Sequence, residues 1–135
     1  MIENRELRSI CHASVGTSDV LKAKAFYQPL LKTLLIDLVC EYEHAVAFGK
    51  DGYPEFWIQI PFDKNSATNG NGVHFGFVAT SKQQVDTFYH QALSLGAKDN
   101  GQPGLRPEYG DKYYGCFVTD LDGNKIEACY WQLNN

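Results

Sequence analysis

The chain repeats one local pattern twice, and this repetition constrains the fold more than any other feature of the sequence. A histidine opens each copy, and an aromatic pair and a leucine follow it at matching distances. Each residue of the second copy lies 62 positions after its counterpart, which gives the pairs His12 and His74, Phe26 and Phe88, Tyr27 and Tyr89, and Leu31 and Leu93. Self-similarity at a fixed offset predicts that one supersecondary unit occurs twice. It also predicts that the two histidines occupy equivalent positions, as in a paired site.

The composition is that of an ordinary globular domain. With 135 residues and 44% hydrophobic content, the chain is long enough for one core, and its net charge is −4. No basic stripe is present to neutralise phosphates, which argues against nucleic acid as a partner. No apolar run is long enough to cross a bilayer, and the charged start lacks the apolar core of a signal peptide. We therefore expect a cytoplasmic protein that does not bind membranes. The four cysteines show no Cys-x-x-Cys spacing, so a zinc ribbon or redox dithiol is not expected.

Each copy of the pattern predicts a strand, a helix and three further strands. Apolar residues recur at helical spacing after each histidine, and Pro29 is expected to kink or divide the first helix. The polar, turn-rich segment 61–72 is the predicted linker. The prediction is a single α+β domain over residues 1–135, with a first module at about 8–62 and a second at about 72–133. Eight strands would form two mixed sheets, with helices on one side and a ligand cleft between the halves.

Four polar side chains of the duplicated unit are candidate metal ligands. Aligning the last strands of the two halves on Ile58 and Ile126 makes Gln59 the counterpart of Glu127. Alternation along a strand then places both on the face opposite the core. Together with His12 and His74 they form a plausible donor set for Zn, Ni, Co, Mn or Fe(II), with open positions for water or substrate. The competing hypothesis is a duplicated scaffold around a metal-free pocket.

Aromatic side chains and one arginine are the candidate substrate contacts. Trp57 lies two residues before Gln59 and therefore on the same face, whereas Tyr109, Tyr113 and Tyr114 flank the long loop 98–112. Arg106 lies in that loop and could bind an anionic group, because its guanidinium suits a carboxylate. The candidates taken forward as substrate-binding residues are Trp57, Arg106, Tyr109 and Tyr114.

Several of these features resemble the vicinal oxygen chelate superfamily. The resembling residues are His12 in the opening strand, the Ser18-Asp19 helix start, His74 at the start of the second half, and the ending Phe117–Ala128, which has the pattern Asp-x-Asp-Gly-x-x-Ile-Glu. The resemblance covers nearly the whole chain. The superfamily includes glyoxalase I, methylmalonyl-CoA epimerase, extradiol dioxygenases and bleomycin-resistance proteins. It implies two tandem βαβββ modules that form a U-shaped, half-open barrel.

The resemblance also implies a site and an activity. His12, Gln59, His74 and Glu127 would stand at the superfamily's metal-ligand positions, and the cofactor would be a divalent metal ion, or none. By analogy with glyoxalase I, Glu127 would be the catalytic base and Gln59 a displaceable ligand. The glutathione contacts of glyoxalase I have no convincing counterpart here, so the substrate stays open.

Three functions follow as hypotheses. The first is a metal-dependent lyase or isomerase, like lactoylglutathione lyase, that acts on a small carbonyl compound by proton transfer. The second is a metal-free module that binds or sequesters a small molecule, like the bleomycin-resistance proteins. The third is an Fe(II) extradiol dioxygenase. It is disfavoured because a fourth protein ligand would crowd the positions that oxygen and a catechol need on the metal. A homodimer is expected, and the sequence does not decide whether the site lies within one chain or across two.

Overall fold

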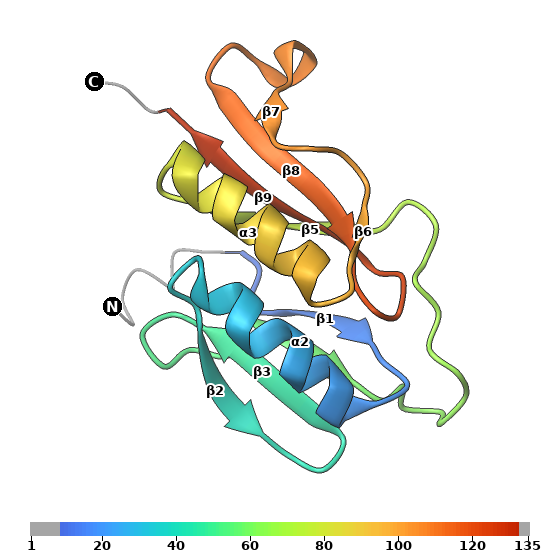
Figure 1. Cartoon of the computed structure of the whole chain (residues 1–135). Coiled ribbons are helices and arrows are strands. Elements are labelled where there is room, and N and C mark those ends of the chain that lie inside the picture. The colour runs from blue at the N-terminus through green and yellow to red at the C-terminus, as the bar shows by residue number, and fades with distance from the viewer. Residues whose placement is uncertain (1–8, 133–135) are drawn as a thin grey trace.

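The computed structural model describes residues 9–132 and contains a βαβββ module followed by a second module of the same topology with one additional short strand (Figure 1). The first module holds β1 (Ala13–Gly16), α2 (Val20–Lys32), β2 (Asp37–Glu41), β3 (Ala45–Gly49) and β4 (Phe56–Gln59). The second holds β5 (His74–Val78), α3 (Lys82–Ser94), β6 (Lys98–Asp99), β7 (Gly104–Leu105), the 3₁₀ turn η1 (Pro107–Tyr109), β8 (Tyr113–Thr119) and β9 (Lys125–Trp131). The long loop predicted at 98–112 thus contains two short strands and a helical turn.

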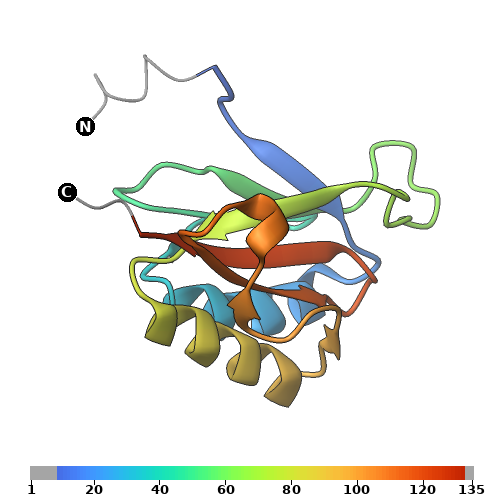
Figure 2. The ribbon, with the colours of Figure 1, turned by 90° about the horizontal axis from the view of Figure 1, so that it is seen from above.

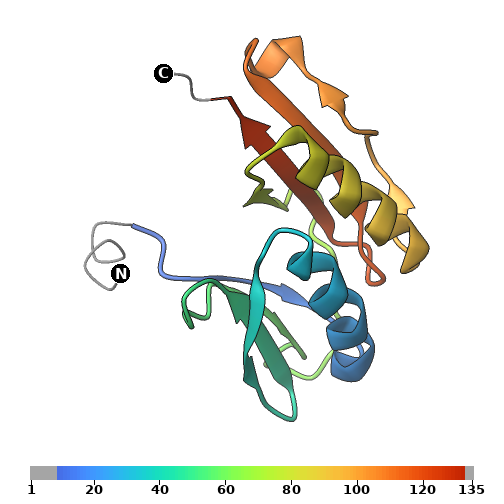
Figure 3. The ribbon, with the colours of Figure 1, turned by 60° about the vertical axis from the view of Figure 1, so that its left-hand side comes forward.

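The two sheets have the same topology around their first and last long strands. In the first sheet the order is β1-β4-β3-β2, and in the second it is β5-β9-β8-β6, with β7 also paired to β8. The opening strand of each module runs parallel to the closing strand, and the other pairs are antiparallel. Figures 2 and 3 show that the helices lie on the same side of the two sheets. Each sheet therefore has one face that no helix covers.

Both helices begin at side-chain caps. The Asp19 carboxylate accepts from the Lys22 amide at 3.0 Å, so Asp19 is the first cap. Ser81 caps α3 by accepting from the Gln84 amide at 3.1 Å. Pro29 lies inside α2 and does not divide it, which excludes one of the two effects predicted for it. It falls in the last turn, where the loss of one backbone hydrogen bond interrupts only the end of the helix.

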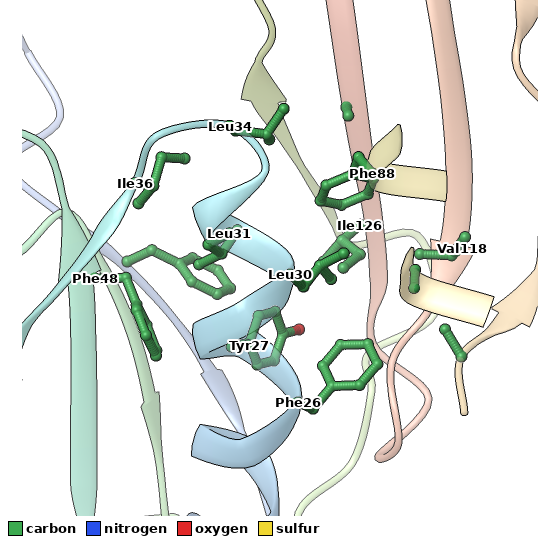
Figure 4. Close-up of a cluster of buried hydrophobic side chains, with 14 of the residues drawn as sticks. Phe26, Tyr27, Leu30, Leu31, Leu34, Ile36, Phe48, Phe88, Val118 and Ile126 are labelled. Atoms are coloured by element: carbon green, nitrogen blue, oxygen red, sulfur yellow. The ribbon is translucent and has the colours of Figure 1, made fainter. Parts of the chain in front are cut away.

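The hydrophobic core lies between the helices and the covered faces of the sheets. Leu30 and Leu31 of α2 and Leu34 just after it are fully buried, and Ile58 and Ile126 fill the same core from the closing strands. Figure 4 shows the α2 side chains facing those of α3, β8 and β9, so one core serves both modules. Each fully buried leucine contributes roughly 1.5–3 kcal/mol to folding.

The predicted fold class is confirmed. The structure is α+β, its two sheets do not close into a barrel, and the two modules have the duplicated topology that the repeat indicated. Within residues 9–132 no helix combines the length and apolarity needed to cross a membrane.

Candidate functional site on the second sheet

The helix-free face of the second sheet carries a connected row of polar side chains. Its residues alternate with core residues along β5, β9 and β8. Here the His74 ring nitrogen Nε2 lies 3.1 Å from Oε1 of Glu127, and the Tyr113 hydroxyl donates to Oε2 of Glu127 at 2.5 Å. The side-chain exposure is 43% for His74 and 11% for Glu127. The row thus runs from an exposed imidazole to a buried phenol through one carboxylate.

Hydrogen-bond chemistry fixes the roles within this row. An ionised carboxylate only accepts, so the tautomer of His74 that binds it carries its hydrogen on Nε2. The other ring nitrogen, Nδ1, is then a proton acceptor. Burial, the hydrogen bond to Glu127 and the negative charge of Glu127 raise the pKa of Tyr113 well above its ordinary value of 10. Tyr113 consequently stays a neutral donor, and His74 is the member of the row that faces solvent.

Two glycines make room for the row. A Cβ on Gly115 would lie 2.1 Å from the Tyr113 hydroxyl oxygen, because the phenol ring lies along β8 over this residue. A Cβ on Gly76 would lie 3.0 Å from Oε1 of Glu127. Gly76 is the register partner of Glu127, and Gly115 is the partner of Cys129. The bond between Tyr113 and Glu127 therefore depends on the absence of a side chain at one position on each of β5 and β8, the two strands that flank β9.

Phe117 forms an aromatic floor beside His74. The His74 ring meets it edge-on with centroids 5.9 Å apart, and Lys125 Nζ lies 4.8 Å from the Phe117 ring centre. The Arg106 guanidinium lies 5.9 Å from the same ring. Cation–π contacts of this kind hold the two long side chains near the sheet.

Arg106, the predicted anion clamp, is bound to its own loop. Its guanidinium donates to the backbone carbonyls of Gln102 at 2.6 Å and Leu105 at 3.3 Å. Lys125 is the cation that lines the pocket next to His74, and the sequence analysis did not single it out. A signal was present, because Lys125 lies two residues before Glu127 and therefore on the same face.

The two tyrosines after the long loop have different surroundings from those predicted. Tyr114 points to the helix side of the sheet, where its hydroxyl donates to Asp86 of α3 at 2.6 Å. This corrects its prediction as a substrate contact, since consecutive strand residues face opposite sides. Tyr113 takes the position on the helix-free face. Tyr109 is half exposed, and its ring meets Tyr113 edge-on at 5.1 Å, so its predicted contact with substrate stays a prediction.

The first sheet holds the other half of the predicted ligand set. His12 is exposed just before β1, and its ring meets Trp57 edge-on at 6.4 Å. Trp57 also stacks on Tyr42, with ring centroids 6.3 Å apart and planes 10° from parallel. Gln59 lines a separate cavity of about 410 Å³ with Ser14, Val15, Gly16, Pro61, Asp63, Ser66, Ala67 and Thr68. The structure thus brings His74 together with Glu127, and His12 together with Trp57.

Strand register corrects the predicted pairing of Gln59 with Glu127. Gly76 pairs with Glu127, and the residue 62 positions before Gly76 is Ser14, which pairs with Trp57. Trp57 is therefore the counterpart of Glu127. Gln59 pairs with Gly16, one step further along the same face. Of the two equivalent positions, only the one in the second module, Glu127, carries a carboxylate.

The donor groups of one chain do not form the predicted four-ligand metal centre. A divalent ion of this kind needs three or four convergent donors. Across residues 9–132, no three His, Cys, Asp or Glu side chains come together as a possible metal site. Imidazole and carboxylate are suitable ligand types, but the row supplies only His74 and Glu127.

The neighbouring thiol is unsuited to nucleophilic chemistry. Cys129 follows Glu127 on the same face of β9. Burial, followed by the negative charge of Glu127, raises the pKa of the Cys129 thiol to about 11. Since the thiolate is the nucleophile, this cysteine is inert near neutral pH.

Comparison with known proteins places the chain in a family. A sequence model of the Glyoxalase/Bleomycin resistance protein/Dioxygenase superfamily matches residues 9–128. The chain belongs to this superfamily. A comparison with curated proteins finds no match.

Solved structures of superfamily proteins have the same fold. The crystal structure of a glyoxalase/bleomycin resistance protein from Albidiferax ferrireducens T118 has 34% identity and a TM-score of 0.80, covering 90% of this chain and 97% of that one. A lactoylglutathione lyase from Agrobacterium tumefaciens has 20% identity and a TM-score of 0.64, covering 92% and 96%. A glyoxalase/bleomycin resistance protein/dioxygenase family enzyme from Burkholderia phytofirmans PsJN has 16% identity and a TM-score of 0.71, covering 91% and 99%. The last two show a shared fold alone.

Proposed function

We propose that this superfamily member catalyses proton transfer on a small carbonyl compound, as a lyase or isomerase, on the helix-free face of the second sheet. The observation that carries the proposal is the row in which Tyr113, Glu127 and His74 are joined at 2.5 and 3.1 Å. An acid-base histidine oriented by a buried carboxylate is a recurring arrangement in proton-transfer catalysis. The proposal moves the role of base from Glu127, which the sequence suggested, to His74.

The proposed step uses the free nitrogen of His74. Nδ1 takes a proton from the carbon next to the carbonyl, and the electron pair of the broken C–H bond moves into an enolate. The imidazolium that forms is stabilised by Glu127, which acts as a positioning residue because both of its oxygens are engaged within the row. Return of the proton to the same or the neighbouring carbon completes the reaction. Positioned acid-base groups of this type accelerate reactions roughly 10²–10⁴-fold.

The test is deuterium exchange into small carbonyl compounds, followed by NMR in heavy water. Methylglyoxal with and without glutathione, together with pyruvate, covers both thiol-dependent and thiol-free substrates. We expect His74→Ala to lower the exchange rate about 100-fold or more. Glu127→Gln is expected to lower kcat with little change in KM, as befits a positioning residue. Wild-type protein that exchanges none of these compounds above the buffer rate would contradict the proposal.

His44 provides a matched control. It is an exposed histidine whose Nε2 lies 3.8 Å from a Glu43 carboxylate oxygen, away from the row. His44→Ala removes the same side chain next to a carboxylate and should leave the exchange rate unchanged. A loss equal to that of His74→Ala would mean that exchange does not depend on the row.

Metal dependence is tested in the same assay. The sequence predicts a divalent ion held by His12, Gln59, His74 and Glu127, and a second copy of the chain could supply the donors that one chain does not group. Activity that survives EDTA and is not raised by Ni or Zn supports the metal-free step above. Activity that appears only after metal loading, with one ion bound for each active site, would support the metal-dependent alternative.

A binding module without turnover is the second candidate. It is favoured by Trp57, which stands where the first module would otherwise carry the counterpart of Glu127. Stacking of Trp57 on Tyr42 offers an apolar surface for a flat ligand. Under this alternative His74→Ala retains full ligand affinity, and no compound undergoes exchange.

A further inference from the structure

The segment that links the modules forms one wall of a polar cavity beside His74. This cavity has a volume of about 330 Å³, near the lower end of ligand pockets, and it suits a ligand of a few heavy atoms. Its lining consists of residues 69–74, Asn100 and, from the β8–β9 hairpin, Thr119, Gly123 and Lys125. The turn residues that the sequence marked as a linker thus lie at the proposed site.

The charge of this lining selects for an anion. Lys125 is a full positive charge in the lining, which also includes three asparagines. One of them, Asn69, donates its side-chain amide to the Gly123 carbonyl at 3.1 Å. No carboxylate belongs to the lining, and within residues 9–132 the structure pairs Lys125 with no acidic side chain. The contact with Phe117 holds the ammonium group near the sheet without neutralising it. A carboxylate in this cavity would meet a cation and amide donors.

Strand register sets the distance between this anion site and the proposed base. His74 and Lys125 are direct register partners in the parallel pair β5–β9 and lie on the same face. Partners of this kind are about 5 Å apart between backbones. The Lys125 Nζ lies 4.8 Å from the Phe117 ring centre and the His74 ring centroid lies 5.9 Å from it, so a short ligand whose carboxylate binds Lys125 extends past the same aromatic ring toward His74. That spacing matches a carbonyl group directly bonded to the carboxylate.

We propose that the cavity formed by segment 69–74 and Lys125 binds the carboxylate of a small 2-oxo acid, which makes this compound class the substrate of the site. The inference rests on the proposed proton-transfer function. It assigns substrate recognition to Lys125 and the asparagine-rich linker, and it places the methyl or methylene carbon next to the carbonyl within reach of His74. Enolisation of that carbon is the step already described, with the same transfer of the proton to the imidazole.

Binding is measured by titrating isotope-labelled protein with pyruvate and following backbone amide signals by NMR. We expect shifts centred on residues 69–74 and 125. Lys125→Met should weaken the pyruvate Kd at least about tenfold, whereas Lys125→Arg should restore most of the affinity. Lys22→Met is the matched control, because Lys22 is exposed on α2 and is not among the residues that line this cavity. Unchanged signals elsewhere in the spectra establish that the variants are folded.

Two further probes define the ligand class. Pyruvamide has the same shape without the charge, and inorganic phosphate has charge without the planar carboxylate. We expect both to bind at least about tenfold more weakly than pyruvate. Equal affinity for pyruvamide, equal affinity for phosphate, or an unaltered Kd in Lys125→Met would each overturn the proposal.

Exchange measured on the same samples separates this inference from the function on which it rests. Pyruvate that binds through Lys125 but shows no deuterium exchange would overturn the proton-transfer function and leave the anion site standing. Exchange that continues in Lys125→Met with an unchanged KM would overturn the anion site and leave the function standing.

Discussion

Tyr113 and Tyr114 are adjacent on β8, yet their hydroxyls bind carboxylates on opposite sides of the sheet. Tyr113 donates to Glu127 on the helix-free face, and Tyr114 donates to Asp86 of α3. The two tyrosines point to opposite faces of the same strand, so substituting each in turn compares the same change on the two faces. Both bonds tie elements together, but only the bond of Tyr113 reaches the carboxylate that orients His74.

Replacing each tyrosine by phenylalanine separates stability from activity. Loss of a hydrogen bond to a charged group costs roughly 1–3 kcal/mol, so both variants should have a lower free energy of unfolding in urea. Tyr113→Phe should also lower the exchange rate about tenfold, because Glu127 loses the donor that fixes its orientation. Tyr114→Phe serves as the control and should keep the wild-type rate. Equal rates in the two variants would show that Tyr113 has no part in positioning.

Substitution of Gly115 is a second way to disrupt the hydrogen bond between Tyr113 and Glu127. Alanine at this position places a methyl group within 2.1 Å of the Tyr113 hydroxyl oxygen, and the phenol must move. We expect Gly115→Ala to break the bond to Glu127 and to lower the exchange rate at least as much as Tyr113→Phe. Absorbance at 295 nm should then show one tyrosine that ionises at a lower pH than in the wild type, because the bond to Glu127 is one of the causes that raise the pKa of Tyr113. An unaltered titration would mean that the strand bends to accept the methyl group.

The sequence contained a signal for Tyr113 that depends on the turn after β8. The Asp122-Gly123 turn joins β8 to β9 and places Phe117 opposite Glu127. Counting back by twos from Phe117 gives Gly115 and Tyr113 on the same face. The prediction of Tyr114 instead of Tyr113 came from the loop 98–112, whose short strands leave no visible periodicity. The phase of a strand is fixed by its partner, and a loop does not reveal it.

At the scale of elements, the turn 120–124 locks the second module onto the first. The Asp122 carboxylate accepts from the Thr17 hydroxyl at 2.6 Å and from the Ser18 amide at 3.1 Å. The Asn124 amide group donates to the Gly16 carbonyl at 3.0 Å. The Asp-x-Asp-Gly part of the family pattern is thus structural. Of the pattern's fixed residues, Glu127 belongs to the row and Gly123 lines the cavity beside it, whereas the two aspartates hold the turn and the contact between modules.

Asp122→Ala tests this lock. The change removes three hydrogen bonds between modules, and the free energy of unfolding should fall by about 1–3 kcal/mol. Asp63→Ala removes the same charge from an exposed turn, where the carboxylate binds only Asn65 among the described residues, and should change stability much less. Urea denaturation followed by circular dichroism measures both. Equal losses would assign the effect to net charge instead of to the lock.

The same scale explains which parts of the fold the sequence could predict. The offset of 62 positions identified the duplicated unit, and helical spacing located α2 and α3. The pairing of Gln59 with Glu127 was wrong by two residues. A slip of two preserves the alternation of core and outer residues, since Phe56 and Ile58 are both buried. Hydrophobic patterning thus determines the face of a strand but leaves a two-residue slip undetected.

At the scale of the molecule, and within residues 9–132, four tyrosines donate to carboxylates and join different elements. The pairs are Tyr27 with Asp120, Tyr89 with Asp99, Tyr113 with Glu127, and Tyr114 with Asp86. Burial and the nearby negative charge raise the pKa of Tyr27, Tyr89 and Tyr113, and the bond to Asp86 leads the causes that raise the pKa of Tyr114 to about 12. The bond from Tyr27 to Asp120 thus joins the two modules, and the bond from Tyr113 to Glu127 lies in the candidate site.

This arrangement predicts that the protein loses stability in alkali by one shared mechanism. The pKa of a tyrosine is about 10 in the unfolded chain and higher in these four folded positions, so the folded state binds more protons above pH 10. The free energy of unfolding should therefore be constant below pH 10 with respect to these groups and fall as the pH rises beyond it. Urea titrations between pH 9 and 12 measure the fall, and Tyr27→Phe should make it shallower by removing the most deeply buried phenol. Absorbance at 295 nm should show these tyrosines ionising together with the loss of circular dichroism. Ionisation of all eight tyrosines before any loss of structure would contradict the mechanism.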